Sequence, residues 1–551
     1  MKKAIVLFTA LFYCSLCLGQ NNPDKAKLSW SKEFRGKKKM TFSQVIGGDE
    51  SGVYITKTTI KDNVRGNNSL PIMERYDKNL GLIKSEKLKV KKKEGRLTYV
   101  NIIQMDGNLY LFYSLVNIWK KSLMLMLQPL DKENLLVVGK AKKIMETKIP
   151  AISQRDQLMN FELKLSEDKT SLMIFHTTPS VGSKPEKIQL IVLDKHMNLD
   201  WSKEVILSYK DKLFETVNFY LDNERNVYLL GKNHHTKRTD KKSGKPNYNF
   251  LLLSYLNNGT DFRTHDISNN DKLFMDMKIA VNHNSDIICS GFYSNEGTGS
   301  IGGSYYLKLE SGTHKIKKES YNDFSSDFLT QNMPDKKLKK TIKIEKGKEP
   351  EMYSYKLDNM VIREDGSITL VGEQMKEINI RRNSQFTQPV PISPMAQSNR
   401  NRRLSTTSDH YSYHDIIVIH FSPEGEIEWS EKIVKKQDTS SDFGFFSSYT
   451  MASVKDKVYF IFNDNPQNLH NNCTETLKNF NPTSKDYMVV LVTLDSQGNQ
   501  SKEVLSIPRD TNILIKPSVS KQISLNQLIF YGQFRENFRL AKLEFEGAFS
   551  Y

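Results

Sequence analysis

The chain has 551 residues, of which 38% are hydrophobic and 10% aromatic, so wholesale disorder is excluded and a large core is expected. Its 80 basic and 63 acidic residues give a net charge of +17, which favours partners of negative charge. Beyond residue 20, no stretch approaches the ~20 consecutive apolar residues that a membrane-spanning helix needs. Composition therefore indicates a large folded protein and names no reaction.

The first nineteen residues are predicted to be a signal peptide. Lys2 and Lys3 precede an apolar run over residues 4–18, and Gly19 stands before the polar residue Gln20. A short basic segment, an apolar segment and a small residue at the cleavage point are typical of exported proteins. We therefore expect residues 20–551 to form a periplasmic, outer-membrane-associated or secreted protein with a net charge of +15.

Export would leave two cysteines, Cys289 and Cys473. In an oxidising compartment they could form a disulfide, or both could remain free thiols. Two cysteines are too few for a disulfide framework or for a four-cysteine zinc site.

One pattern recurs eight times: an apolar run, a polar turn of Asp, Asn, Gly or Ser, and a second apolar run. Each copy predicts a tight β-hairpin, because these turn residues tolerate left-handed backbone angles between β-favouring segments. The second strands of the hairpins are predicted to start near Val53, Leu109, Leu172, Val227, Ile287, Ile368, Val458 and Leu528. A further hairpin follows most copies, and its last strand alternates apolar and charged residues, as at 201–204 and 429–432. That alternation predicts an outer strand with one face in water, whereas the three inner strands are expected to be apolar on both faces.

Eight units of four antiparallel strands, with no helical period between them, resemble a β-propeller. We predict an all-β chain folded as a single propeller, with eight blades as the first choice and seven as the second. The last unit lacks an outer strand, while residues 27–34 closely match the outer strand that contains Trp201. We therefore expect the N-terminal strand to pair in the last blade and close the ring. Two separate β-sandwiches or a linear β-solenoid are the alternatives.

Three outer strands carry tryptophan at one position: Trp30, Trp201 and Trp429. This pattern resembles the tryptophan-docking repeat of quinoprotein-type eight-bladed propellers, where such a residue packs against the next blade. Other units depart from it, with Lys84 and Gln500 near that position. The resemblance implies blade-to-blade packing and is most compatible with a non-catalytic assembly scaffold. Quinoprotein dehydrogenases also use a vicinal cysteine pair, which this chain lacks, so no cofactor is expected.

Long insertions at 232–249, 376–414 and 464–485 fall between the second and third strands of their units, and a long connection at 321–352 joins two units. In a propeller all four emerge on one face, where partners commonly bind. The predicted binding residues are the basic residues of two insertions: Lys237, Arg238, Lys241, Lys242, Arg381, Arg382, Arg400, Arg402 and Arg403. They would attract acidic glycans or lipopolysaccharide phosphates, while nucleic acid is not expected. The alternative is that these side chains only solvate the surface.

Motifs for catalysis or metal binding are much weaker in this sequence than the repeat pattern. His234–His235 and His410/His414 have ligand-like spacing, but they lie in loops and are interpreted as ordinary histidines, so no metal is expected. No nucleophile elbow or phosphate-binding loop occurs. Glu373 and Asp464 end second strands and could serve a glycan-active enzyme, or be simple rim carboxylates. The preferred hypothesis is an exported, monomeric, non-enzymatic binding or scaffold protein of the cell envelope, whose partner is an envelope protein or an acidic glycan. The alternative is a propeller hydrolase or lyase that uses acids near the central channel.

Overall fold

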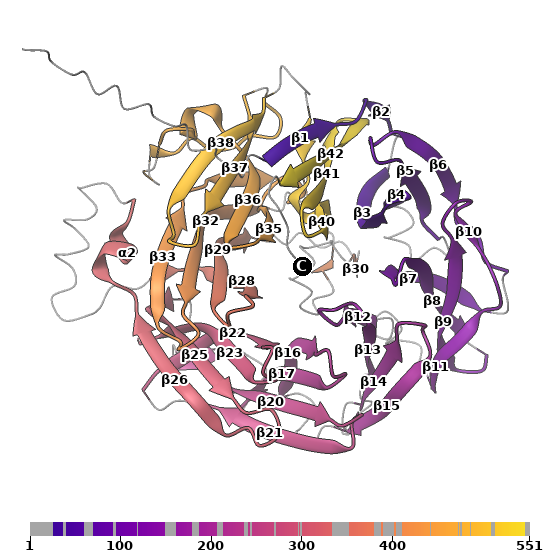
Figure 1. Cartoon of the computed structure of the whole chain (residues 1–551), viewed down its shortest axis with the longest axis horizontal. Helices are drawn as coiled ribbons and strands as arrows, with labels where there is room; N and C mark the ends of the chain where they lie inside the picture. The colour runs from indigo at the N-terminus through magenta and orange to yellow at the C-terminus, as the bar shows by residue number, and fades with distance from the viewer. Residues whose placement is uncertain are drawn as a thin grey trace, which may run out of the picture.

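Eight antiparallel β-sheets stand radially around a common axis in the computed structural model (Figure 1). The structure describes residues 26–36, 40–59, 70–91, 95–117, 119–148, 161–178, 187–206, 213–235, 241–242, 245–268, 271–295, 297, 300–332, 352–378, 387–388, 402–403, 410–440, 442, 444–471, 473, 476–484, 486–507 and 513–545. The predicted signal peptide, residues 1–19, lies outside this described part. The all-β class and the single eight-bladed propeller are confirmed.

Blades 1 to 4 follow one another along the chain, each built from the axis outward. Blade 1 contains β3 (Met40–Asp49), β4 (Gly52–Thr59), β5 (Ile72–Tyr76) and β6 (Leu82–Lys87). Blade 2 contains β7 (Arg96–Met105), β8 (Asn108–Asn117), β9 (Ser122–Asp131) and β10 (Leu136–Val137), and β11 (Lys142–Lys148) also pairs with β9. Blade 3 contains β12 (Phe161–Leu165), β13 (Ser171–Thr178), β14 (Lys187–Asp194) and β15 (Leu199–Ile206). Blade 4 contains β16 (Phe214–Leu221), β17 (Val227–His234), β20 (Tyr248–Leu256) and β21 (Asp261–Ile267).

Blades 5 to 8 complete the ring. Blade 5 contains β22 (Leu273–Val281), β23 (Ile287–Ser294), β25 (Gly303–Leu309) and β26 (Ile316–Asp323). Blade 6 contains β28 (Tyr355–Ile362), β29 (Ile368–Ile378), β32 (His410–Phe421) and β33 (Ile427–Ile433), with β34 (Gln437–Ser440) paired to β32. Blade 7 contains β35 (Thr450–Val454), β36 (Lys457–Asp464), β37 (Met488–Leu494) and β38 (Gln500–Ser506). Blade 8 contains β39 (Leu514–Ile515), β40 (Lys521–Ser524), β41 (Gln527–Phe534), β42 (Asn537–Phe545), β1 (Ala26–Trp30) and β2 (Phe34–Arg35).

The few remaining elements lie outside the blade sheets. Short two-stranded ladders join β18 (Lys241–Lys242) to β19 (Lys245–Pro246), β24 (Ser300–Ile301) to β27 (Met352–Tyr353), and β30 (Thr387–Gln388) to β31 (Arg402–Arg403). One short helix, α2 (Ser326–Thr330), packs on β33, where the Lys432 ammonium donates to the carbonyl of Phe328 at 3.3 Å. In the described residues, no helix has the length and apolar character required to cross a membrane.

The ring is closed by the two ends of the chain. Strand β1 pairs antiparallel with β42, placing Leu28 opposite Leu543 and Trp30 opposite Ala541, as the indigo and yellow ribbons in Figure 1 show. The N–H of Ser31 extends this pairing with a 2.8 Å hydrogen bond to the carbonyl of Leu540. The N-terminal strand therefore covers what would otherwise be an open sheet edge in blade 8, as predicted.

The core lies in the seams between adjacent blades, and it is formed mainly by the middle strands. The eight second strands start at, or one residue before, the predicted positions, and β23 is buried along its whole length. The innermost strands differ from expectation, because they include polar residues and are only partly buried, as in β28. The expectation of three apolar strands per blade is therefore wrong for the innermost strand. Its free edge faces the ring axis and not another strand.

Two of the three repeated tryptophans link neighbouring blades. The indole N–H of Trp201 donates to the carbonyl of Arg225 in blade 4 at 3.1 Å, and that of Trp429 donates to Ser496 in blade 7 at 2.9 Å. Each ring lies on a turn glycine of the next blade, Gly259 or Gly498, where a Cβ atom would approach the ring to 2.9 Å. Both glycines have positive φ angles, which favour glycine at these turns. The expected blade-to-blade packing is thus present at these two sites, whereas Trp30 packs within the seam of blades 7 and 8.

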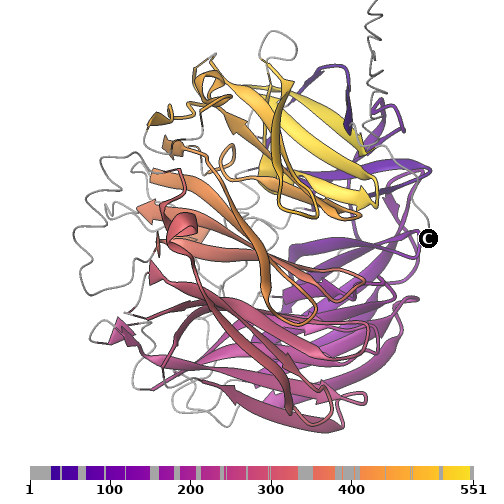
Figure 2. The same cartoon turned by 60° about the vertical axis from the view of Figure 1, so that its left-hand side comes forward.

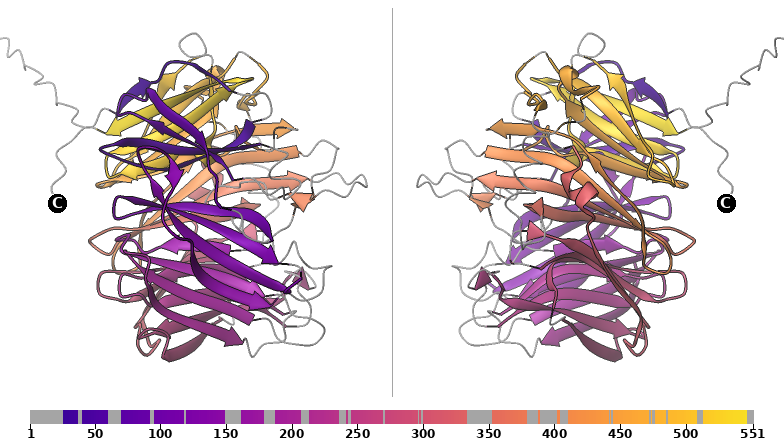
Figure 3. Two further views of the ribbon diagram at one scale, coloured as in Figure 1. Left: turned by 90° about the vertical axis from the view of Figure 1, so that its right-hand side faces the viewer. Right: turned by 90° about the vertical axis from the view of Figure 1, so that its left-hand side faces the viewer.

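The second strands of the blades end, and the third strands begin, on one face of the ring, which we call the loop face. Figures 2 and 3 show that the orange strands of blade 6 extend farther on this face than their neighbours. These strands are the longest in the ring, with 11 residues in β29 and 12 in β32. Beside the insertions predicted at 232–249, 376–414 and 464–485, the described second strands end and the third strands begin on this face, while the placement of the insertions themselves stays a prediction.

Candidate functional site

The extended part of blade 6 is a hairpin that continues beyond the body of the sheet. Pairing of β29 with β32 persists to Ile378 opposite His410, and β34 adds a third strand by placing Ser440 opposite His410. A register shift between Glu373 and Met375 separates this blade 6 hairpin from the regular ladder. A bulge of this kind changes the direction of a strand, so the hairpin is aimed away from the ring.

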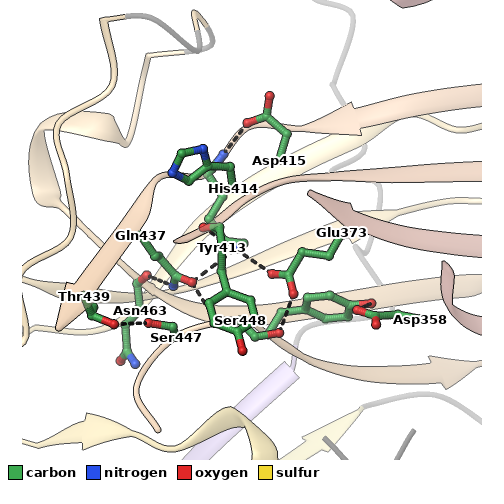
Figure 4. Close-up of polar contacts among 12 residues, drawn as sticks. Asp358, Glu373, Tyr413, His414, Asp415, Gln437, Thr439, Ser447, Ser448 and Asn463 are labelled. Carbon is green, nitrogen blue, oxygen red and sulfur yellow. Dashed lines mark hydrogen bonds and ion pairs between the residues drawn. The ribbon is translucent and has the colours of Figure 1, made fainter. Parts of the chain in front are cut away.

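A buried ion pair lies at the base of the blade 6 hairpin (Figure 4). The Lys435 ammonium is 2.7 Å from Glu373 Oε1, and the two side chains are 0% and 2% exposed. The same ammonium donates to the carbonyl of Tyr413 at 3.0 Å and to Gln437 Oε1 at 3.1 Å. Burial of a charge pair is tolerated only when such additional hydrogen bonds complete its coordination. The pair thus connects β29, β32 and β34 at one point.

Hydrogen bonds extend this network into the next two blades. Ser448 Oγ donates to Glu373 Oε2 at 2.7 Å, and the Gln437 amide donates to the carbonyl of Asn463 at 2.8 Å. The Asn463 amide then donates to the carbonyl of Ile515 in blade 8 at 2.8 Å. We call these five side chains, Glu373, Lys435, Gln437, Ser448 and Asn463, the polar cluster. It holds the base of the hairpin against blades 7 and 8.

One further carboxyl group borders the polar cluster. Asp358 is the extra residue of a bulge in β28, between Leu357 and Asn359, and most of its surface is buried. The Tyr449 hydroxyl donates to Asp358 Oδ2 at 3.2 Å. Burial raises the pKa of Asp358 to about 7, and the negative charge of Glu373 adds to the effect. Near neutral pH, Asp358 can therefore hold or release a proton beside a carboxylate that Lys435 neutralises.

The position of Asp358 is apolar in other blades. Innermost strands β3, β7, β16 and β22 have bulges whose extra residues are Ile46, Val100, Val217 and Met275. These four side chains pack into the apolar seams with the following blades. In the sequence, four of these bulge residues are followed by Asn or Asp, and this pattern marks the position: Val100–Asn101, Val217–Asn218, Met275–Asp276 and Asp358–Asn359. Aligning the repeats on their turns, and not on their innermost strands, missed it.

Innermost strands also place charges of both signs around the ring axis. Glu162 and Lys164 lie on β12, and Lys278 lies on β22. Burial raises the pKa of Glu162 to about 7. Lys164 contacts water but is enclosed by the ring, and this enclosure together with the charge of Lys278 lowers its pKa. The innermost strands that the structure describes thus carry charges of both signs near the axis.

The two acids suggested by the sequence are both paired with lysines. Besides the Glu373–Lys435 pair, Asp464 Oδ2 lies 2.8 Å from the Lys502 ammonium, with Asp464 fully buried. They are therefore not exposed rim carboxylates, and each already has a positive partner. Neither carboxylate is free to contact a ligand in this arrangement, because a lysine ammonium already lies within 2.8 Å of each one.

The predicted basic binding residues are described only in part. Four of them form backbone ladders: Lys241 and Lys242 in β18, and Arg402 and Arg403 in β31. The other five, Lys237, Arg238, Arg381, Arg382 and Arg400, lie outside the described residues. Their common loop face is supported by the strands that flank both insertions, while their role in binding stays a prediction.

The predicted thiols and histidines have structural surroundings. Cys289 and Cys473 are both free thiols, which decides between the two states that the sequence left open. Cys289 is buried in β23, and burial raises its pKa to about 12. The His414 ring lies 2.9 Å from Asp438 Oδ1, and the His410 ring lies 2.7 Å from Ser440 Oγ. Among the described residues, no three His, Cys, Asp or Glu side chains are grouped as metal ligands.

Comparison with known proteins finds distant structural similarity and no relative by sequence. No family model matches the chain, and no curated protein matches it in sequence. Solved structures that resemble it include the WD40 domain of SCAP from fission yeast (8% identity, 94% of each chain covered, TM-score 0.39). Others are the β-propeller domain of the Trilobed protease from Pyrococcus furiosus (11% identity, 88% of this chain and 97% of that chain, TM-score 0.32) and the polysaccharide lyase Uly1 (8% identity, 93% and 100%, TM-score 0.35). The eight sheets and their closure therefore define this chain as an eight-bladed β-propeller.

Proposed function

We propose that this protein is an exported, non-enzymatic binding or scaffold propeller of the cell envelope, and that it binds a polyanionic partner on its loop face. The observation that carries the proposal is the blade 6 hairpin, which projects from the loop face and is held at its base by the polar cluster. A rigid base is what a binding loop requires, because preorganisation reduces the entropy lost on binding.

Charge on the inserted loops supplies the preference for a polyanion. Residues 232–249 and 376–408 each have a net charge of +5, and both insertions are flanked by strands that end on the loop face. Basic groups gathered on one face attract polyanions and accelerate their association at low salt. Acidic glycans or lipopolysaccharide phosphates are therefore the expected ligands, and an acidic envelope protein is the alternative.

Binding of purified protein to lipopolysaccharide and to a soluble acidic polysaccharide, measured by calorimetry at several salt concentrations, tests the proposal. The loop variant replaces Lys237, Arg238, Lys241 and Lys242 by Gln. We expect affinity to fall at least about tenfold, since each lost surface charge contributes up to about 1 kcal/mol at low salt.

A matched control replaces four exposed lysines on turns of the opposite face by Gln. These are Lys78, Lys169, Lys195 and Lys315. The control variant has the same net charge as the loop variant, so it separates a local effect from a general charge effect. Equal loss of affinity in both variants, or no binding by the parent protein, would contradict a loop-face site.

A second candidate function is a glycan hydrolase or lyase that uses acids near the ring axis. Asp358 and Glu162 support it, because burial raises the pKa of both carboxyl groups to about 7. A group that is half protonated near neutral pH can serve as a general acid. Incubation with a panel of acidic polysaccharides and mass analysis of the products tests this function. Products that disappear in Asp358→Asn or Glu162→Gln would favour it over the binding role.

A further inference from the structure

An exposed tryptophan marks the loop face of blade 2. Trp119 lies in the turn between β8 and β9 with 94% of its surface exposed, whereas Trp201 is buried and Trp30 and Trp429 are partly buried. Burial of an indole in an apolar environment is strongly favourable, and its N–H prefers a polar partner at the boundary. A fully exposed indole at a hairpin tip is therefore unsatisfied in the isolated protein.

The tip that carries Trp119 has a defined shape. Asn117 pairs with Ser122 across the hairpin, and the Asn117 side-chain oxygen accepts a 2.9 Å hydrogen bond from the N–H of Lys120. Lys121 adopts a positive φ of 50°, which completes the turn. The indole is thus presented on a short and structured hairpin, with two exposed lysines immediately beside it.

The tip that carries Trp119 lies on the loop face, and its chemistry matches a membrane surface. Because it joins a second strand to a third, the tip leaves the ring on the loop face, on the other side of the axis from the blade 6 hairpin (Figure 1). An indole flanked by lysines matches the boundary of an anionic bilayer, where aromatic rings lie at the headgroup level and ammonium groups meet phosphates. A soluble polysaccharide would also use the lysines and would stack one face of a sugar on the indole, whereas a bilayer boundary surrounds the ring with an apolar layer.

We propose that the Trp119–Lys120–Lys121 tip inserts into the headgroup region of an anionic lipid membrane, so that the loop face lies against a membrane surface. The inference rests on the proposed function and deepens it, because it assigns the polyanionic partner to lipid headgroups. Trp119 would supply apolar insertion, and Lys120 and Lys121 would supply attraction to phosphate.

Tryptophan emission with lipid vesicles is the direct test. Because the other three tryptophans lie in or between blades, a blue shift on vesicle addition reports mainly on Trp119. We expect the shift with equimolar phosphatidylcholine and phosphatidylglycerol, and not with phosphatidylcholine alone. Brominated lipids should quench the same emission. No shift with anionic vesicles would overturn the inference.

Vesicle partitioning of variants separates the contributions. Trp119→Ala should lower the partition coefficient roughly tenfold, because burial of even half an indole corresponds to that factor or more. Lys120→Gln and Lys121→Gln should each lower it about fivefold, in line with the attraction of one surface lysine to an anionic leaflet. Leu525→Ala is the matched control, since Leu525 is 57% exposed on a turn of the opposite face. Its partitioning should equal that of the parent protein.

The outcomes distinguish this inference from the proposed function. If the loop variant at 237–242 loses binding to vesicles and polysaccharide while Trp119→Ala changes neither vesicle binding nor the emission shift on vesicle addition, the loop-face function stands and lipid insertion is overturned. If the emission shift depends on Trp119 while the loop variant and its control behave alike, insertion stands and the basic insertions are not the site.

Discussion

Two seams of the same ring differ in what they bury. Between blades 4 and 5 the core is almost wholly apolar and aromatic, with Leu230 fully buried and the rings of Phe274 and Tyr305 separated by 4.4 Å. Between blades 6 and 7 an apolar core of similar kind ends at the polar cluster, where a lysine and a glutamate are buried together. The repeated blade therefore tolerates a costly exchange of apolar for polar contacts at this seam. A second buried pair, Lys57–Glu74 at 2.6 Å, lies where blade 1 meets the Phe538 ring of blade 8.

That difference coincides with the blade 6 hairpin. Apolar seams hold blades together through area and shape, which are not directional. Hydrogen bonds and ion pairs are directional, so the polar cluster fixes the angle at which the hairpin leaves the ring. We interpret the polar seam as the part of the ring that positions a functional loop, and the apolar seams as the parts that supply stability.

The largest effect is expected from breaking the buried ion pair. Lys435→Met leaves the Glu373 carboxylate buried without its partner, so the free energy of unfolding should fall by about 3–5 kcal/mol. Guanidinium denaturation measures the change, and loop-face binding should weaken as the hairpin loses its base. The double variant Lys435→Met/Glu373→Leu should recover most of the stability, because no charge is then left unpaired. Equal losses in the single and double variants would refute this account of the pair.

A truncation in the apolar seam should cost less and leave binding intact. Leu230→Ala is expected to lower the free energy of unfolding by about 2–4 kcal/mol, since it removes fully buried methyl groups and leaves a cavity. The same denaturation experiment measures it. The loss should not change between about pH 5 and pH 8, and affinity on the loop face should equal that of the parent. Reduced affinity in this variant would remove the distinction between the two seams.

A smaller effect, dependent on pH, is expected when Asp358 is made like its counterparts. The folded state raises the pKa of Asp358 from 3.8 to about 7, so between these values it binds more protons than the unfolded chain. Its contribution to stability therefore falls as the pH rises through this range. Asp358→Val should increase the free energy of unfolding by roughly 2 kcal/mol near pH 8 and by less near pH 5.

The reciprocal variant sharpens this test in the apolar seam. Val217 occupies the same bulge position in blade 4. Val217→Asp should lower stability, and the loss should be larger near pH 8 than near pH 5, because the charged form is penalised most. If the free energy of unfolding of Asp358→Val and of Val217→Asp depended on pH in the same way as that of the parent protein, the bulge carboxyl would not titrate differently on folding, and this account would be wrong.

Local pattern predicted the architecture of this chain well. Turn residues between apolar runs located all eight second strands, and the similarity of residues 27–34 to the strand at Trp201 predicted the closure that pairs β1 with β42. Two of the three repeated tryptophans pack as the resemblance implied. These features are predictable because each depends on a few adjacent residues and on a repeat that presents the same evidence several times.

The candidate site was much less accessible to such reasoning. Glu373 was identified as an acid near the end of its strand, but Lys435, which lies 2.7 Å away, is 62 residues further along the chain. Asp358 stands out as the polar exception only when the innermost strands are aligned by their bulges. The alternation of apolar residues does not show such bulges. Trp119 gave no pattern, because a single exposed residue has no repeat to compare it with.

The sequence by itself determined the class and the closure and favoured eight blades over seven, since hairpin turns and strand alternation are encoded within short segments. Only the tertiary structure decided which seams bury ion pairs, which carboxylates have lysine partners and which tryptophan remains in water. The physical reason is that these properties depend on contacts between blades. Residues distant in sequence set the burial and electrostatic environment there, and no local segment contains both partners.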